Sequence, residues 1–292
     1  MTGARFRAVT ALVPVLDGLC FAEGPRWHDG RLWFSDMHDL HVLAFDPATE
    51  ETEVVVEVPG QPSGLGWRPD GTLLVVSMTD RRLLAVRDGA TEEVADLSDL
   101  APFHCNDMVV DGRGNAYVGN FGFDLHDPDA DQRTTNLVLV TPDGEARVVA
   151  DDLFFPNGCV VTPDGGTLVV GESFSGRLTA FTIAEDGTLH DRREWARVRG
   201  AVPDGICLDA EGAIWLASPI SHQVLRVAEG GEVLDEVRTS DERQPFACML
   251  GGPDRRTLYV CTAIDSEPVG ARAARAGRIE AIEVAVPGAG LP

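Results

Sequence analysis

One pattern returns six times along this chain of 292 residues. Each copy has an opening residue, a short apolar run, a turn rich in Gly and Asp, and a second apolar run. The opening residues lie 40, 43, 51, 47 and 42 positions apart, and they are Glu23, Ser63, Asn106, Asn157, Asp204 and Phe246. A repeat of this length with several short strands per unit is typical of a β-propeller.

Each copy contains four segments of strand length. In the first copy they are the stretch around 24–27, then 31–36, 41–47 and 52–58. The runs are rich in β-branched and aromatic residues and are too short for helices, and no amphipathic pattern exceeds two helical turns. The sequence therefore predicts an all-β protein, a single six-bladed β-propeller domain over residues 1–292 with four antiparallel strands per blade.

The last copy reaches only its third strand before the chain ends in 287–292. The N-terminal segment FRAVTALV (6–13) belongs to no copy of its own. We expect this segment to supply the outer strand of the last blade and to close the ring. Such closure leaves only short, protected sheet edges.

The composition limits which kinds of binding partner and which cell compartment we expect for this protein. The chain has no apolar run of 18 residues and no basic N-terminal region followed by an apolar core, so we expect a cytoplasmic protein without a membrane partner. The net charge of −23 argues against nucleic acid, whose phosphates would be repelled. We expect a small-molecule substrate and a monomer or weak homo-oligomer.

Six cysteines occur without a CxxC pair, at positions 20, 105, 159, 207, 248 and 261. In a chain without an export signal they are expected to be reduced thiols, and a disulfide framework is the alternative. Four of them fall close to blade openings, where they would serve as small apolar fillers near the axis.

The opening residues suggest a metal site. The first strand of each propeller blade lines the central channel, so Glu23, Asn106, Asn157 and Asp204 would converge at one face. Two buried carboxylates and two amides are costly unless a cation compensates them, and Ca²⁺ or Mg²⁺ accepts such oxygens. The ring lacks His and Cys, which disfavours a preference for zinc or copper. The alternative is turn chemistry, because Asn-Gly and Asp-Gly commonly form turns.

Four motifs match a known family: FAEGPRW (21–27), HCNDMVVDGRGNAYVGN (104–120), FPNGCVVTPDGGTLVVGESFSGRLTAF (155–181) and PDGICLDAEGAIWLA (203–217). Over roughly residues 20 to 285 the chain resembles the senescence marker protein / gluconolactonase / luciferin-regenerating enzyme family of six-bladed propellers. The resemblance implies one divalent cation on Glu23, Asn157 and Asp204, most often Ca²⁺, with Zn²⁺, Mn²⁺ or Mg²⁺ as other possibilities. It also implies that Asn106 lies beside the metal and contacts the substrate or, as in some members, the metal itself.

Family members with known activity are mostly lactonases on sugar lactones, and relatives hydrolyse organophosphates. One position departs from the family pattern. Sugar lactonases of the family often have Arg two residues before the channel Asn, and here that residue is His104. His104 is either a substitution in a variable pocket, or a sign of a changed substrate or of an acid/base group, since a neutral imidazole can relay protons near pH 7. Gluconolactone itself is then in question as the substrate.

Two long segments, 121–136 and 263–277, join second to third strands and should return to the face of the opening residues. We interpret them as lids over the channel mouth. The first carries Phe121, Phe123 and Asp124, and Asp124 lies where some relatives have a substrate-contacting carboxylate. The alternative for this segment is an acidic surface turn. The expected substrate-binding residues are therefore His104, Asn106, Phe121, Phe123 and Asp124.

These features together predict a metal-dependent hydrolase of a small lactone or ester. The cation would polarise the carbonyl for attack by water, with Asp204 taking the proton and Asn106 as the second catalytic residue. The chain has no Gly-x-Ser-x-Gly elbow, which argues against a serine hydrolase. Two alternatives remain: a phosphotriesterase-like hydrolase on the same scaffold, or a non-catalytic ligand-binding propeller with a structural cation.

Overall fold

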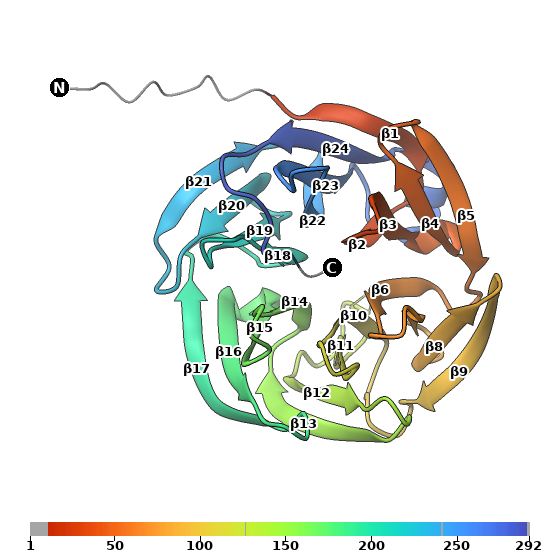
Figure 1. Cartoon of the computed structure of the whole chain (residues 1–292), viewed down its shortest axis with the longest axis vertical. Coiled ribbons are helices and arrows are strands. Elements are labelled where there is room, and N and C mark those ends of the chain that lie inside the picture. Colours follow the sequence, from red (N-terminus) through yellow and green to blue (C-terminus); the bar gives the residue numbers. More distant parts are fainter. Residues whose placement is uncertain (1–10, 126, 241, 291–292) are drawn as a thin grey trace.

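The computed structural model describes residues 11–290 except 126 and 241. Figure 1 shows six four-stranded sheets arranged around one central axis. Every pair of neighbouring strands within these sheets is antiparallel. The predicted six-bladed all-β propeller with four antiparallel strands per blade is confirmed.

The blades follow one another along the chain. Blade 1 comprises β2 (Ala22–His28), β3 (Arg31–Asp36), β4 (His41–Asp46) and β5 (Glu51–Glu57). Blade 2 comprises β6 (Pro62–Trp67), β7 (Leu73–Ser77), β8 (Arg82–Arg87) and β9 (Ala90–Asp96). Blade 3 comprises β10 (Cys105–Val110), β11 (Ala116–Asn120), β12 (Thr135–Val140) and β13 (Ala146–Leu153).

Blade 4 comprises β14 (Pro156–Val161), β15 (Thr167–Glu172), β16 (Arg177–Ile183) and β17 (Leu189–Arg197). Blade 5 comprises β18 (Ile206–Leu208), β19 (Ile214–Ser218), β20 (Gln223–Val227) and β21 (Val233–Arg238). Blade 6 comprises β22 (Gln244–Gly251), β23 (Thr257–Ala263), β24 (Gly277–Glu283) and β1 (Val13–Leu19). The helices of the described residues are short, and they are η1 (Met37–Asp39), η2 (Ser173–Ser175) and α1 (Pro268–Ala274).

The N-terminal strand closes the last blade, as expected, but it is not the predicted segment. The strand that pairs with β24 is β1, from Val13 to Leu19, whereas 6–13 was expected. Residues 6–10 of the predicted segment lie outside the described residues. The difference has a simple cause: β2 begins at Ala22, so the stretch directly before it is the one that reaches β24 through a short connection.

The apolar core lies between the blades. Buried side chains of blades 1 and 2, for example, form one cluster that includes Val42, Leu65, Trp67 and Val75. All six cysteines are buried free thiols, so the disulfide alternative is wrong. Over the part of the chain that the structure describes, no helix is long and apolar enough to cross a membrane.

Glycines allow the first strands to approach one another at the axis. A Cβ atom on Gly158 would lie 2.5 Å from the carbonyl oxygen of Asp204, and one on Gly205 would collide with Ala247. Neither glycine has a backbone φ in the left-handed region. In the dipeptides Asn157-Gly158 and Asp204-Gly205, glycine therefore permits close contact between neighbouring blades. The alternative that these two dipeptides form turns is wrong.

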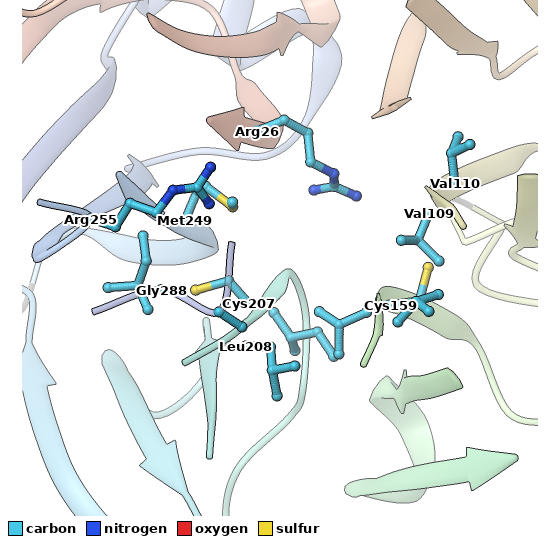
Figure 2. Close-up of a pocket in the computed structure, with 14 residues that line it drawn as sticks. Arg26, Val109, Val110, Cys159, Cys207, Leu208, Met249, Arg255 and Gly288 are labelled. Carbon is cyan, nitrogen blue, oxygen red and sulfur yellow. The ribbon is translucent and has the colours of Figure 1, made fainter. Parts of the chain in front are cut away.

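A small cavity lies on the axis at the face where the first strands end. Figure 2 shows the cavity there, with the side chain of Arg26 directed towards it; apolar residues such as Val109 and Met249 line most of it. The cavity has a volume of about 30 Å³, room for about two water molecules. The C-terminal segment packs beside it, and the N–H of Ala289 donates to Leu208 O at 3.0 Å. This cavity is therefore too small to hold a lactone-sized molecule.

The close approach of blades 4 and 5 predicts the effect of adding one methyl group. Gly158→Ala should lower the free energy of unfolding by about 1–3 kcal/mol, because the new Cβ forces two first strands apart. Gly112→Ala is the matched control, since its Cβ would meet no atom within 4 Å. Urea denaturation of both variants measures the difference, and an equal loss of stability in the two would contradict the packing argument.

Candidate functional site

The opening residues lie where pairing between first and second strands becomes irregular. The register of β2 with β3 shifts next to Glu23, that of β10 with β11 shifts around Asn106, and that of β14 with β15 around Asn157. Such bulges turn side chains away from the regular alternation of a strand. Asp204 lies two residues before β18, and its N–H donates to Ala217 O at 3.0 Å. We call the six opening residues the axial ring and their end of the channel the ring face.

The polar side chains of the axial ring form a hydrogen-bonded chain across blades 2 to 5. Ser63 Oγ donates to Asn106 Oδ1 at 3.3 Å, and Asn106 Nδ2 donates to Asn157 Oδ1 at 3.1 Å. Asn157 Nδ2 then donates to Ser173 Oγ at 3.2 Å, and that hydroxyl donates to Pro203 O at 2.7 Å. Both amides are buried, so these bonds fix the direction in which their oxygens point.

Two carboxylates of the axial ring share one electrostatic environment. Burial, followed by repulsion from Asp204, raises the pKa of Glu23 well above its usual value. Burial, followed by repulsion from Asp107, raises the pKa of Asp204 to about 8. The N–H of Gly24 donates to Glu23 Oε2 at 2.9 Å and offsets part of the cost for Glu23. The structure thus brings Glu23 close enough to Asp204 for their negative charges to repel each other, and neighbouring groups offset this repulsion only in part.

A buried ion pair that the sequence did not reveal lies beside the axial ring. Arg26 Nη2 donates to Asp107 Oδ1 at 3.0 Å and to Met108 O at 2.6 Å, which joins blade 1 to blade 3. Both side chains are buried. The sequence does show that Arg26 and Asp107 are charged residues within apolar strand segments, and that Asp107 directly follows Asn106. These features did not reveal the pairing, because 81 residues separate the partners.

The four charged side chains in and beside the axial ring carry a net formal charge of −2 when all are ionised. Glu23, Asp107 and Asp204 contribute −3 when ionised and Arg26 contributes +1, which leaves −2, the charge that one divalent cation would balance. Among the described residues, no three His, Cys, Asp or Glu side chains are grouped so as to hold a metal. A cation at the ring would therefore depend on the amide oxygen of Asn157 as well as on Glu23 and Asp204. Such oxygen donors suit Ca²⁺ and Mg²⁺.

The other predicted site residues lie beside the axial ring on blade 3. The His104 ring stacks on Phe103, with centroids 4.1 Å apart, and its centroid is 6.3 Å from that of Phe121. Phe121 and Phe123 are buried, and Asp124 is half-buried in the same segment. His104 is thus placed among aromatic side chains.

Both predicted lid segments leave the ends of second strands, on the ring face. The described residues between β11 and β12 form no helix or strand, whereas the segment between β23 and β24 contains α1. Arg272 of α1 holds that segment against blade 1, because its Nε donates to His38 O at 2.8 Å. The position of both segments agrees with a covering role, which remains a prediction.

Comparison with known proteins identifies the family. The family model described as SMP-30/Gluconolactonase/LRE-like region matches residues 21–264. A 6-deoxy-6-sulfogluconolactonase of Pseudomonas putida is 28% identical over 278 residues, which cover 92% of this chain and 93% of that protein.

Two solved structures show the same fold. A luciferin-regenerating enzyme aligns with a TM-score of 0.80 at 19% identity and covers 95% of this chain and 97% of its own. A calcium-binding protein, regucalcin, of Agrobacterium tumefaciens aligns with a TM-score of 0.78 at 21% identity and covers 96% and 95%. With the family match over residues 21–264, these likenesses lead to one conclusion: the chain belongs to the SMP-30/gluconolactonase/LRE-like family.

Proposed function

We propose that this protein is a metal-dependent hydrolase that opens a small lactone or ester with water. The observation that carries the proposal is the axial ring, where two half-buried carboxylates and two buried, hydrogen-bonded amides meet at the ring face. The family adds support, because a relative covering 92% of this chain is a sugar-acid lactonase by name.

The proposed cofactor is one divalent cation held by Glu23, Asn157 and Asp204. The formal charge of −2 around the ring and the all-oxygen donor set favour Ca²⁺, with Zn²⁺, Mn²⁺ or Mg²⁺ as alternatives. The name of the Agrobacterium relative, a calcium-binding protein, agrees with this choice. When bound, the cation supplies Lewis acidity, which polarises the ester carbonyl and stabilises the negative charge that develops on its oxygen.

The residues of the chain have separate tasks in this reaction. Asn106 already donates one Nδ2 proton to Asn157, and its other Nδ2 proton is available to the carbonyl oxygen of the substrate. The carboxylate of Asp204 takes the proton of the attacking water. Water oxygen adds to the carbonyl carbon, the ring C–O bond of the resulting tetrahedral adduct then breaks, and the leaving oxygen receives that proton, which gives the hydroxy acid.

The experiment that tests the proposal is an activity panel of lactones, aryl esters and phosphotriesters, measured with EDTA and after addition of each metal. Hydrolysis of lactones or esters that EDTA abolishes and metal restores is expected. Turnover of phosphotriesters alone would favour the phosphotriesterase-like alternative. Binding without turnover anywhere in the panel would favour the ligand-binding propeller.

The ligand assignment predicts the metal content of variants. After dialysis against calcium, the wild-type protein should retain one Ca²⁺ per chain and Asp204→Ala should retain almost none, because a principal ligand is lost. Elemental analysis of the purified proteins measures this. The control is Asp143→Ala, which removes an exposed carboxylate from a hairpin turn. Equal calcium in Asp204→Ala and the wild type would rule out the assignment.

The role of Asn106 predicts a loss of rate with little loss of metal. Asn106→Ala should lower kcat by about 10²–10³-fold, typical of losing one donor to a developing oxyanion. Steady-state kinetics on the best substrate of the panel provide the value, and Asn115→Ala is the control for a buried amide at the other end of blade 3. Near-normal kcat in Asn106→Ala would remove this residue from the reaction.

The raised pKa values predict how stability depends on pH. Without metal, the folded protein binds more protons than the unfolded chain at pH values between the ordinary carboxyl pKa and about 8, so its free energy of unfolding falls as pH rises through this range. Calcium replaces those protons, and its stabilising effect should therefore grow with pH. Melting temperatures with EDTA and with calcium at pH 5 and pH 8 test this. A calcium effect of equal size at both pH values would contradict it.

A further inference from the structure

Aromatic side chains of blades 3 and 4 form a continuous wall beside the axial ring. Three contacts build it: the ring centroids of Phe121 and Phe155 are 4.9 Å apart, those of Phe155 and Phe174 are 5.0 Å apart, and those of Phe123 and Phe174 are 5.9 Å apart. Phe154 and Phe103 extend the wall, the latter through its stack with His104. Each phenylalanine either follows a second strand or precedes a first strand, so all belong to the ring face. We call this set the aromatic wall.

Apolar side chains continue on the other side of the axis. Phe246 of the axial ring contacts Phe21, with centroids 4.7 Å apart. These two residues belong to one buried cluster with Met37, Met78 and Phe121. The cluster joins blades 6, 1 and 2 to the aromatic wall of blade 3. The approach to the axial ring is therefore bordered by apolar side chains from several blades.

The loops of the ring face also carry exposed apolar side chains, and one of them, Phe174, belongs to the aromatic wall. Among the described residues, nine large hydrophobic side chains are exposed, and four of these lie in ring-face loops: Phe174, Ile220, Ile264 and Val269. The other five lie on the outermost strands of their blades. Exposed apolar groups next to a candidate site are typical of a surface that binds an apolar ligand.

Three polar side chains of the ring-face loops, Arg133, Arg272 and His38, form hydrogen bonds within the protein. Arg133 Nε donates to Gly122 O at 3.1 Å, and Arg272 Nε donates to the backbone of His38. The His38 ring contacts Gln61 Nε2 at 2.8 Å and Ser266 O at 3.0 Å. A polyhydroxylated ligand would lose water from its hydroxyl groups against the aromatic wall, where phenylalanine offers no hydrogen bond in return.

We propose that the substrate of this site carries an alkyl or aryl substituent, which lies against the aromatic wall while the axial ring holds the carbonyl group. The protein then prefers apolar lactones or esters to polyhydroxylated sugar lactones. This inference rests on the hydrolase function proposed above and adds the substrate class. The stack of His104 on Phe103 agrees with it, because the imidazole lies flat within the aromatic set.

The test compares three substrates that share a six-membered lactone ring: δ-valerolactone without a substituent, δ-decalactone with a pentyl chain, and δ-gluconolactone with hydroxyl groups. Each methylene buried against the wall should raise kcat/KM about three- to fourfold, so δ-decalactone should exceed δ-valerolactone by at least about 20-fold. δ-Gluconolactone should be the poorest of the three. A higher kcat/KM for δ-gluconolactone than for δ-decalactone would overturn the inference while leaving the hydrolase function intact.

Variants of Phe174 test whether the preference for an alkyl-substituted lactone arises at the aromatic wall. Phe174→Ser should lower kcat/KM for δ-decalactone at least about fivefold, mainly through KM, with a smaller loss for δ-valerolactone. Phe174→Leu should keep most of the wild-type kcat/KM for δ-decalactone, because leucine is also apolar. The control is Val148→Ser on β13, since Val148 and Phe174 are both 42% exposed. Unchanged use of δ-decalactone by Phe174→Ser would also overturn the inference.

A binding measurement separates this inference from the proposed chemistry. Calorimetry with two lactams, one with a pentyl chain and one with the hydroxyl groups of gluconolactone, reports affinity without turnover. Tighter binding of the pentyl lactam supports the apolar site even if no lactone is hydrolysed, in which case the hydrolase function fails alone. Tighter binding of the hydroxylated lactam, or binding of neither, overturns the inference.

Discussion

Poor solvation of the carboxylates at the propeller axis, to which their mutual repulsion adds, is the constraint on which the rest of this site depends. Six first strands must converge for the ring to close, and Gly158 and Gly205 permit that approach. Convergence also brings Glu23 and Asp204 into one poorly solvated region, where each carboxylate resists ionisation. Arg26 is already paired with Asp107, so it offsets only part of the negative charge. A divalent cation is the simplest compensation for what remains.

The two ends of the channel then acquire different properties. At the end where the first strands finish, apolar side chains and the C-terminal segment leave room for only about two waters (Figure 2). At the ring face, the fixed amides of Asn106 and Asn157 lie beside the aromatic wall. A substrate that approaches from this face meets an apolar surface first and polar groups last. This order favours a ligand with one polar carbonyl group and an apolar remainder.

The sequence was sufficient for the architecture and for the composition of the axial ring, because a sixfold repeat places equivalent positions on equivalent strands. It was not sufficient for contacts between repeats. The pairing of Arg26 with Asp107 joins different blades and leaves no periodic trace. The closing strand was placed too early, since only its pairing with β24 shows that it starts at Val13. The glycines after Asn157 and Asp204 resemble turn residues until the neighbouring strands are seen.

The most direct test of this account is an anomalous difference map from crystals of the protein grown with calcium. The account predicts a single strong peak at the axis, with the carboxylate oxygens of Glu23 and Asp204 and the amide oxygen of Asn157 about 2.3–2.6 Å away. Crystals of Asp204→Ala grown in the same way should lack the peak. A fully occupied calcium elsewhere in the protein, with none at the axial ring, would contradict the central claim.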